Sequence, residues 1–232
     1  MSTPRGRICV SIATEDAASA ISLATPVLPI VDLVEIRLDA MRTPDFIACL
    51  AAIPKPVLMT YRPHWEGGQF DGSEEARINA LCQAVEAGAA YVDVELRTEA
   101  SLRDRLLAVA RRQGAKVIVS SHDFSATPSL PALRETLGQM IAIRADIGKI
   151  VTTAATADEA LRILSLQLDA RAAGFPLSAF AMGEAGRISR LATLYLGGYL
   201  TYAAPDELRA TAPGQLSASR LDALVSLFEA ST

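Results

Sequence analysis

Residues 116–151 read KVIVSSHDFSATPSLPALRETLGQMIAIRADIGKIV and contain a complete strand–helix–strand unit. The run KVIVSS (116–121) is short and β-branched, and GKIVTTA (148–154) repeats that character. Between the two runs lies a longer Ala- and Leu-rich stretch, 129–145, which is typical of a helix. Two strands that are joined by such a crossover helix run parallel in one sheet.

The same alternation runs through the whole chain. We expect strands at 8–13, 31–39, 56–62, 91–97, 116–121, 148–154, 176–182 and 198–203. We expect helices at 15–24, 44–53, 73–87, 101–113, 129–145, 156–173, 187–196 and 217–230. Eight such units predict an α/β fold, a closed (β/α)8 TIM barrel formed as a single domain over residues 1–232. A doubly wound open sheet is the structural alternative, but the chain has neither GxGxxG after its first strand nor GxxxxGK(S/T).

Polar residues and glycines mark several of the expected helix ends. Ser73 and Thr156 are each followed by acidic residues, as at a capped helix N-terminus. Thr43-Pro44-Asp45 offers a cap, a proline in the first turn and an adjacent acid. Glycines stand where three helices should end, at Gly88, Gly114 and Gly174.

Composition and charge indicate which kinds of partner and which cellular location to expect for the protein. Hydrophobic residues make up 50%, aromatic residues 5%, and the net charge is −4. This charge gives no electrostatic reason to expect nucleic acid or an anionic membrane. Cys9, Cys49 and Cys82 are too widely spaced for a disulfide framework or a zinc site, so we expect a cytoplasmic protein. MSTPRGRICVSIA (1–13) lacks the apolar core of a signal peptide, and no apolar run is long enough to span a membrane.

Charged side chains occur at spacing two within two strands that a closed barrel would bury. The sets are Glu35, Arg37 and Asp39, and Asp93, Glu95 and Arg97. Each set lies on one side of its strand, where buried charges must be paired or must face the mouth of the barrel. A structural ion-pair network and a polar recognition site are both consistent with this pattern.

Lysine is rare in this chain. Of its 22 lysine and arginine residues, only Lys55, Lys116 and Lys149 are lysines. Lysine can form a Schiff base, which arginine effectively cannot, so a lysine within a strand is a candidate nucleophile. Lys55 lies in a Pro-Lys-Pro turn, whereas Lys116 and Lys149 both open strands. Strand position alone does not choose between these two.

Further candidates follow the strands, where the loops of a barrel carry its chemistry. His122 comes directly after the strand that opens with Lys116, and it can be either a proton-transfer group or a capping residue in a turn. Arg62 and Glu66 lie at the end of the third strand and in the loop after it. A glycine-containing loop leads into a helix that carries Arg190, a residue suited to binding a carboxylate.

Taken together, seven motifs resemble type I 3-dehydroquinate dehydratase (3-dehydroquinase). They are EIRLD (35–39), TYRPHWEGG (60–68), VDVEL (92–96), SSHDF (120–124), GKIV (148–151), AMGEAGRISR (181–190) and APGQ (212–215). They follow the order of the family and span nearly the whole chain. The resemblance implies a TIM barrel that converts 3-dehydroquinate to 3-dehydroshikimate by syn elimination, in the shikimate pathway of aromatic amino acid biosynthesis. It also implies a homodimer that uses no metal and no organic cofactor.

The resemblance also assigns roles to individual residues. Lys149 matches the Schiff-base lysine, His122 the general base and acid, and Glu66 the carboxylate associated with that histidine. The substrate-binding positions are Glu35, Arg37 and Arg62 for hydroxyl groups, Arg190, Thr211 and Gln215 around the carboxylate, and Met182 on the apolar wall. We further expect Glu35 to hold Arg37 in place. Asp123 is expected to be a turn or cap residue.

The chain departs from the family pattern near its C-terminus. Thr211 replaces a serine, and residues 203–210 form a slightly longer segment. Two other functions are alternatives: a class I aldolase-like barrel, whose substrates mostly carry a phosphate, and an anion-binding barrel without catalysis. The apolar segment LDALVSLF (221–228) can pack on the barrel or contribute to a dimer.

Overall fold

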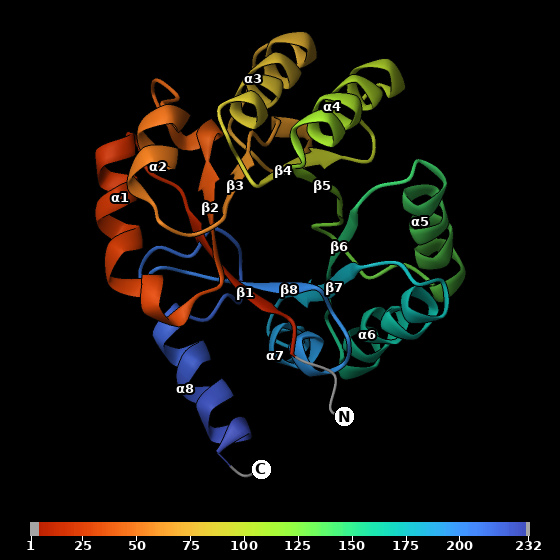
Figure 1. Ribbon diagram of the computed structural model, residues 1–232. Helices are drawn as coiled ribbons and strands as arrows, with labels where there is room; N and C mark the ends of the chain where they lie inside the picture. The colour runs from red at the N-terminus through yellow and green to blue at the C-terminus, as the bar shows by residue number, and fades with distance from the viewer. Residues whose placement is uncertain (1–4, 231–232) are drawn as a thin grey trace.

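A computed structural model describes residues 5–230 as a ring of parallel strands surrounded by helices (Figure 1). The strands are β1 (Arg7–Ile12), β2 (Leu33–Arg37), β3 (Val57–Thr60), β4 (Tyr91–Glu95), β5 (Lys116–His122), β6 (Ile147–Thr153), β7 (Leu177–Met182) and β8 (Leu200–Ala203). The α-helices are α1 (Ala17–Ala24), α2 (Phe46–Ala52), α3 (Glu74–Glu86), α4 (Ala100–Gln113), α5 (Leu130–Ala142), α6 (Ala157–Ala172), α7 (Arg187–Tyr195) and α8 (Ala218–Glu229). Short 3-10 helices are η1 (Thr25–Ile30), η2 (Leu38–Ala40) and η3 (His64–Glu66). This is the (β/α)8 barrel that the sequence predicts.

The expected element boundaries lie close to those of the structure. Ser73 and Thr156 cap α3 and α6 by accepting hydrogen bonds from backbone N–H groups of the first turns, as predicted. Helix α2 starts later than expected, because Asp45 rather than Thr43 provides its cap. Residues 1–4, which open the stretch assessed for a signal peptide, and the last two residues of the predicted domain lie outside the described part.

The strands pair in the order β7-β6-β5-β4-β3-β2-β1-β8, and the barrel closes between β7 and β8. This seam is held by two hydrogen bonds. Tyr199 N donates to Leu177 O at 2.8 Å, and Leu200 N donates to the Ser178 hydroxyl at 3.1 Å. A side-chain oxygen therefore takes the place of a backbone acceptor in the closure.

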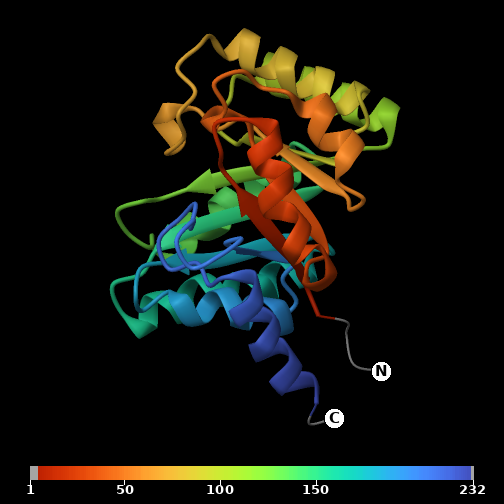
Figure 2. The same ribbon diagram turned by 90° about the vertical axis from the view of Figure 1, so that its left-hand side faces the viewer.

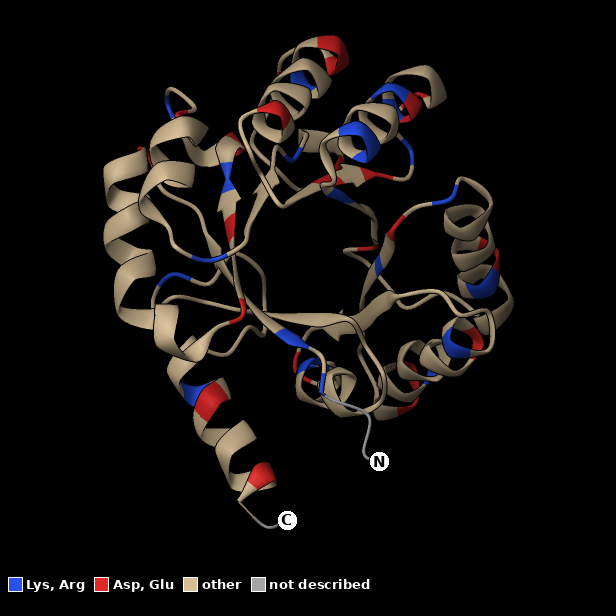
Figure 3. Ribbon diagram, viewed as in Figure 1, with Lys and Arg blue, Asp and Glu red and all other residues tan. Residues whose placement is uncertain are grey.

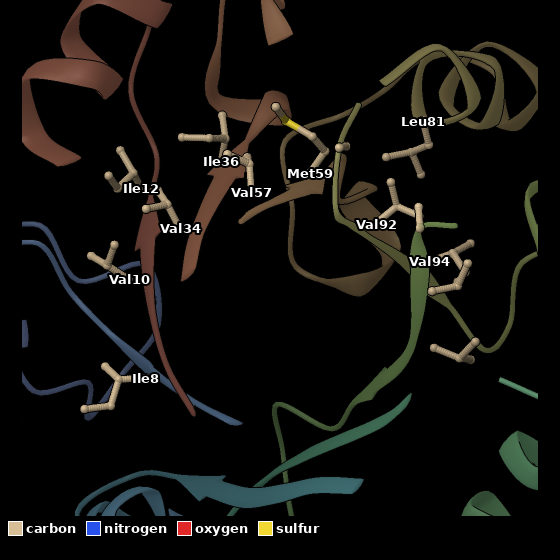
Figure 4. Packing of buried hydrophobic residues seen from close by; sticks show 14 of the residues in the cluster. Ile8, Val10, Ile12, Val34, Ile36, Val57, Met59, Leu81, Val92 and Val94 are labelled. Carbon is tan, nitrogen blue, oxygen red and sulfur yellow. The ribbon is translucent and has the colours of Figure 1, made fainter. Parts of the chain in front are cut away.

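Side chains alternate between the two sides of each strand. Figure 4 shows one set, including Val10, Ile36 and Met59, directed outward toward the helices, with Leu81 of α3 above Val92. The other set fills the barrel interior with Cys9, Leu33, Leu58, Tyr91, Ile118, Ile147, Val151, Phe180, Met182, Leu200 and Tyr202. Both sides of the sheet are thus buried, and polar residues on the inner side need partners.

The two ends of the barrel differ in character. At the end where strands begin, Arg7 donates to the hydroxyls of Tyr91 and Tyr199, and Lys116 is exposed. The loops that follow β3, β5 and β8 gather at the opposite end (Figure 2). Acidic and basic segments succeed each other along β2, whereas α1 carries no charge (Figure 3). The polar interior therefore belongs to the end at which the strands finish.

The apolar segment LDALVSLF (221–228) lies in α8 and is buried only in part. Leu221 and Val225 of α8 are buried, so this part of the segment packs on the barrel. Leu227 and Phe228 are 69% and 58% exposed, and the Phe228 ring lies 5.4 Å from that of Tyr195. Among the described helices, none combines the length and apolarity needed to cross a bilayer.

Candidate active site

One cavity opens at the end of the barrel where the strands finish. The ten residues to which the family resemblance assigns roles line it: Glu35, Arg37, Arg62, Glu66, His122, Lys149, Met182, Arg190, Thr211 and Gln215. They come from β2, β5, β6, β7, α7 and the loops after β3 and β8, so the barrel brings together residues that lie far apart in the sequence. The same cavity is lined by Gly67, Phe124, Val151, Phe180, Tyr202 and Ala212.

The two strand lysines occupy opposite ends of the barrel. Lys116 is the first residue of β5; it is exposed, and its Nζ lies 5.9 Å from the centre of the Tyr199 ring. Lys149 is the third residue of β6, is buried and lines the cavity. Its Nζ lies 3.2 Å from Asp93 Oδ2 and 4.2 Å from the centre of the Tyr202 ring. Only Lys149 of this pair can meet a ligand in the cavity.

His122 ends β5 and is held by Glu66. Glu66 Oε1 accepts a hydrogen bond from His122 N at 2.7 Å and lies 3.3 Å from the Nδ1 of the same residue. Burial, together with the charges of Arg62 and Lys149, lowers the pKa of His122 well below its usual value. Burial also raises the pKa of Glu66 to about 7. The imidazole is therefore neutral at physiological pH and can accept a proton.

The charges on β4 form a buried ion network with the loop after β3. Arg62 binds Asp93 at 2.9 Å and Glu95 at 2.6 Å, and it donates to Ser120 Oγ at 2.7 Å. Although burial opposes ionisation, the charges of Arg62 and Lys149 hold the pKa of Asp93 below its usual range. The network therefore fixes Arg62 and keeps Asp93 negative beside the Lys149 amine.

Arg97 does not share the side of β4 that its spacing suggested. The strand ends at Glu95, and Arg97 is exposed with its guanidinium 5.3 Å from the centre of the Trp65 ring. A strand's two-residue period applies only while the strand continues.

Glu35 and Arg37 have separate partners, which corrects the expectation that Glu35 holds Arg37. Glu35 accepts hydrogen bonds from the hydroxyls of Ser11 and Thr60. Arg37 instead forms a two-pronged contact with Asp39, at 2.9 and 2.6 Å. Because the chain turns into η2 after Arg37, Asp39 can fold back onto the guanidinium. Its carboxylate also accepts from the backbone of Arg62, so β2 and the loop after β3 are tied together.

Arg190 lies in the first turn of α7 with unused hydrogen-bonding capacity. Its Nη2 donates to Pro213 O at 2.9 Å, but its buried Nε has no hydrogen-bond partner among the described residues. Its guanidinium lies 5.0 Å from the centre of the Phe180 ring, and burial lowers the pKa of Arg190 to about 10. A buried cation without a counter-charge is suited to binding an anion from the cavity.

The loop after β8 is held by its own side chains. Gln215 Oε1 accepts from Thr211 N at 2.7 Å, and Thr211 Oγ1 donates to Ser11 Oγ at 2.9 Å. Because Ser11 in turn donates to Glu35, the loop is connected to the interior of the barrel. Met182, at the end of β7, supplies an apolar part of the wall.

Three residues that line the cavity, and Asp93 beside Lys149, have no role assigned from the sequence. Asp93 stood out as a charge in a strand, but its pairing with Lys149 depends on which side chains face each other across the barrel. Phe180 and Tyr202 resembled ordinary core residues, and Phe124 resembled a loop residue. The sequence signal for Phe180 and Tyr202 is their place on the inner side of a strand near its end, whereas Phe124 lies in the loop after β5.

Asp123 plays the turn role expected for it. Its Oδ1 accepts hydrogen bonds from the backbone of Ser125 and Ala126 at 2.9 Å each. Despite partial burial, which opposes ionisation, these bonds and that from the Ser125 hydroxyl lower the pKa of Asp123. It therefore shapes the loop after His122 instead of facing the cavity.

Comparison with known proteins agrees with this arrangement. The family model described as type I 3-dehydroquinase matches residues 8–232. The 3-dehydroquinate dehydratase of Desulfotalea psychrophila is 39% identical over 215 residues, covering 93% of this chain and 95% of that protein. The one from Methanosarcina barkeri is 35% identical over 207 residues, covering 85% of this chain and 86% of that protein.

Solved structures show the same relationship. Type I 3-dehydroquinate dehydratase from Clostridium difficile has a TM-score of 0.90 at 26% identity, covering 100% of this chain and 95% of that one. The Enterococcus faecalis enzyme has a TM-score of 0.85 at 29% identity, covering 98% and 96%. The family match extends from the first strand to the last helix, and the chain belongs to the type I 3-dehydroquinase family.

Proposed function

We propose that this protein is a lyase that dehydrates 3-dehydroquinate to 3-dehydroshikimate through a Schiff base on Lys149, with His122 as base and acid. The dehydratase activity itself follows from membership of the family and from close relatives that carry the name. The observation that carries the mechanism is a buried lysine and a neutral histidine on neighbouring strands, lining one cavity. Ser120 pairs with Lys149 and His122 with Val151, so His122 stands about 7 Å closer to the mouth.

The first step makes the carbon–nitrogen bond. Lys149, as a neutral amine, adds to the ketone of the substrate, and the resulting carbinolamine loses its oxygen as water. The product is an iminium ion, whose positive nitrogen withdraws electrons from the adjacent carbon. The C–H bond of that carbon becomes acidic enough for an imidazole to break.

The elimination uses one imidazole twice. Neutral His122 removes the proton from the adjacent carbon, which gives an enamine. The enamine expels the tertiary hydroxyl, and the proton that His122 carries leaves with it as water. Hydrolysis of the remaining iminium releases the product and restores the lysine. Glu66, 3.3 Å from Nδ1, stabilises the imidazolium while it exists.

Other lining groups account for recognition of the substrate. Arg190 offers a donor without a partner to the substrate carboxylate, beside Gln215 and Thr211. Glu35, Arg37 and Arg62 are held by partners outside the cavity and present fixed polar groups to the hydroxyls, while Met182 contacts the carbon ring. Among the described residues, no cluster of side chains is arranged to hold a metal ion.

Borohydride reduction in the presence of 3-dehydroquinate tests this proposal. We expect a stable adduct that mass spectrometry maps to Lys149, with none on Lys116. Lys149→Ala should abolish both the adduct and turnover, whereas Lys116→Ala should retain both. An adduct accompanied by carbon–carbon cleavage products would favour the aldolase-like alternative, and turnover without any adduct would exclude a Schiff base.

A further inference from the structure

Tyr202 has two unusual features in the interior of the barrel. The face of its ring lies 4.2 Å from Lys149 Nζ, measured to the ring centre, and the residue lines the cavity. Its hydroxyl is buried and has no hydrogen-bond partner among the described residues. Burial, and then the charge of Glu35, raises the pKa of Tyr202 well above its usual value, so the hydroxyl stays neutral. Because the hydroxyl is neutral and makes no hydrogen bond, the ring is the part of Tyr202 that interacts with Lys149.

From this geometry we infer that Tyr202 is a positioning residue for Lys149. Its ring stabilises the positively charged nitrogen of the covalent iminium, an inference that rests on the proposed function. An aromatic face attracts a cation within about 6 Å, and the attraction is strongest where water is excluded. Lys149 is 5% exposed, so the amine meets this condition.

The surroundings of Lys149 explain why a second contact is needed. In the free protein Asp93 Oδ2 holds the amine from one side at 3.2 Å, while the Tyr202 ring approaches from another element, β8. The nitrogen is thus confined between a carboxylate and an aromatic face. The neutral amine has two N–H bonds and the iminium has only one, whereas attraction to an aromatic face needs none of them.

Neighbouring groups follow the same arrangement. The Phe180 ring lies 6.2 Å from the Tyr202 ring. The guanidinium of Arg190 lies 5.0 Å from the centre of the Phe180 ring. Phe124 stacks on His122, with ring centres 5.9 Å apart and planes at 13°. In a chain with 5% aromatic residues, three aromatic rings in one cavity each lie beside an ionisable side chain. The ring of Tyr202 is the member of this set that meets the candidate nucleophile.

The test measures the fraction of protein that borohydride traps on Lys149 at saturating 3-dehydroquinate. Tyr202→Leu should lower that fraction and kcat by about tenfold, equivalent to about 1.4 kcal/mol. Tyr202→Phe keeps the ring face and removes the unpaired hydroxyl, so trapping should stay within about twofold and Tm should rise. Tyr199→Leu is the matched control, because Tyr199 faces Lys116 at the other end of the barrel and should not affect trapping.

Ring-fluorinated phenylalanines at position 202 provide a readout that a space-filling role would not affect. Each added fluorine weakens the attraction of the ring for a cation with little change in shape, so the trapped fraction should fall stepwise. This series decides the question even if Tyr202→Leu does not fold. Equal trapping across the series, or an equal loss in Tyr199→Leu, would overturn the inference about Tyr202. Failure of the wild-type protein to form any adduct would overturn the proposed function instead.

Discussion

His122 joins two properties that a general base requires: it faces the cavity, and its depressed pKa leaves it neutral. His122→Ala should lower kcat by about 10²–10⁴, the usual effect of removing an acid–base group. The Lys149 adduct should still form, because attack on the ketone uses a different side chain. Steady-state kinetics and borohydride trapping check the two halves of this prediction.

The other histidine provides the control for that experiment. His64 is exposed and does not line the cavity, so His64→Ala should leave kcat within about twofold. Full turnover in His122→Ala would contradict the assignment, whatever the effect at His64.

Glu66 should determine how activity depends on pH. Its raised pKa of about 7 means that the carboxylate, which stabilises the imidazolium, is present above pH 7 and is lost as pH falls through that value. The kcat/KM should therefore decline below about pH 7. Because the pKa of His122 lies well below its usual value, histidine is not the source of this decline.

Glu66→Gln separates these two groups. The variant should be slower than the wild type above pH 7, should approach the wild-type rate below that pH, and should lose the decline near pH 7, since an amide does not titrate. A pH profile of kcat/KM measures both effects. A decline that persists unchanged at the same pH in Glu66→Gln would show that another group titrates there.

At the scale of elements, the loop after β3 depends on one close approach of the backbone. A Cβ at Gly68 would lie 2.0 Å from the carbonyl oxygen of Arg62, too close for any side chain. Gly68→Ala should therefore displace the turn that carries Glu66 and reduce kcat by about 10²-fold. Kinetics with intact circular dichroism would locate this effect in the loop.

Gly138 supplies the matched substitution. It lies in α5, and a Cβ there would meet nothing within 4 Å. Gly138→Ala should raise the free energy of unfolding by roughly 0.5–1 kcal/mol and leave kcat unchanged, because alanine favours the helix. A loss of activity at both glycines would mean that the cavity responds to stability in general.

The strands and helices were predictable because their signal is local. Alternating β-branched and Ala/Leu-rich runs predict each strand and each α-helix but not the 3-10 helices. The largest boundary difference is the end of α5, at Ala142 where 145 was expected. The start of α2 was misjudged because Thr43 and Asp45 are both suitable caps, and the choice depends on how the chain leaves η2.

The contents of the site were predictable only in part. Motifs that resemble the family identified ten residues lining the cavity, but not their partners. Glu35 was expected to hold Arg37, yet Asp39 does so, because the turn at η2 changes the direction of the chain. Lys116 and Lys149 could not be separated by strand position, since height in a barrel depends on the stagger of all its strands.

For the whole molecule, the seam between β7 and β8 is the place where the ring closes. Ser178 is 1% exposed, and its hydroxyl accepts from Leu200 N. Ser178→Ala would leave that buried N–H without an acceptor, so the free energy of unfolding should fall by about 1–3 kcal/mol. Chemical denaturation measures this loss, and Ser226→Ala, an exposed site on α8, should change stability by less than about 0.5 kcal/mol.

Assembly and cellular location stay predictions at this scale. The sequence predicts a single domain and a cytoplasmic location, and the resemblance to the family implies a homodimer. The exposed side chains of Leu227 and Phe228 lie on α8, within the segment considered for dimer contacts. Analytical ultracentrifugation of the purified protein would measure its mass, and a monomer at micromolar concentration would contradict the dimer.

The alternation of side chains along β6 also limits how a gene for this barrel can change in length. Lys149 faces the cavity and Ile150 packs toward the helices, so losing one codon within the strand would exchange their directions. The aliphatic side chain of Ile150 would then face the cavity, and the amine of Lys149 would enter the hydrophobic core between the strands and the helices. Insertions and deletions should therefore accumulate in loops such as 203–210 during evolution, while the strands are inherited at constant length.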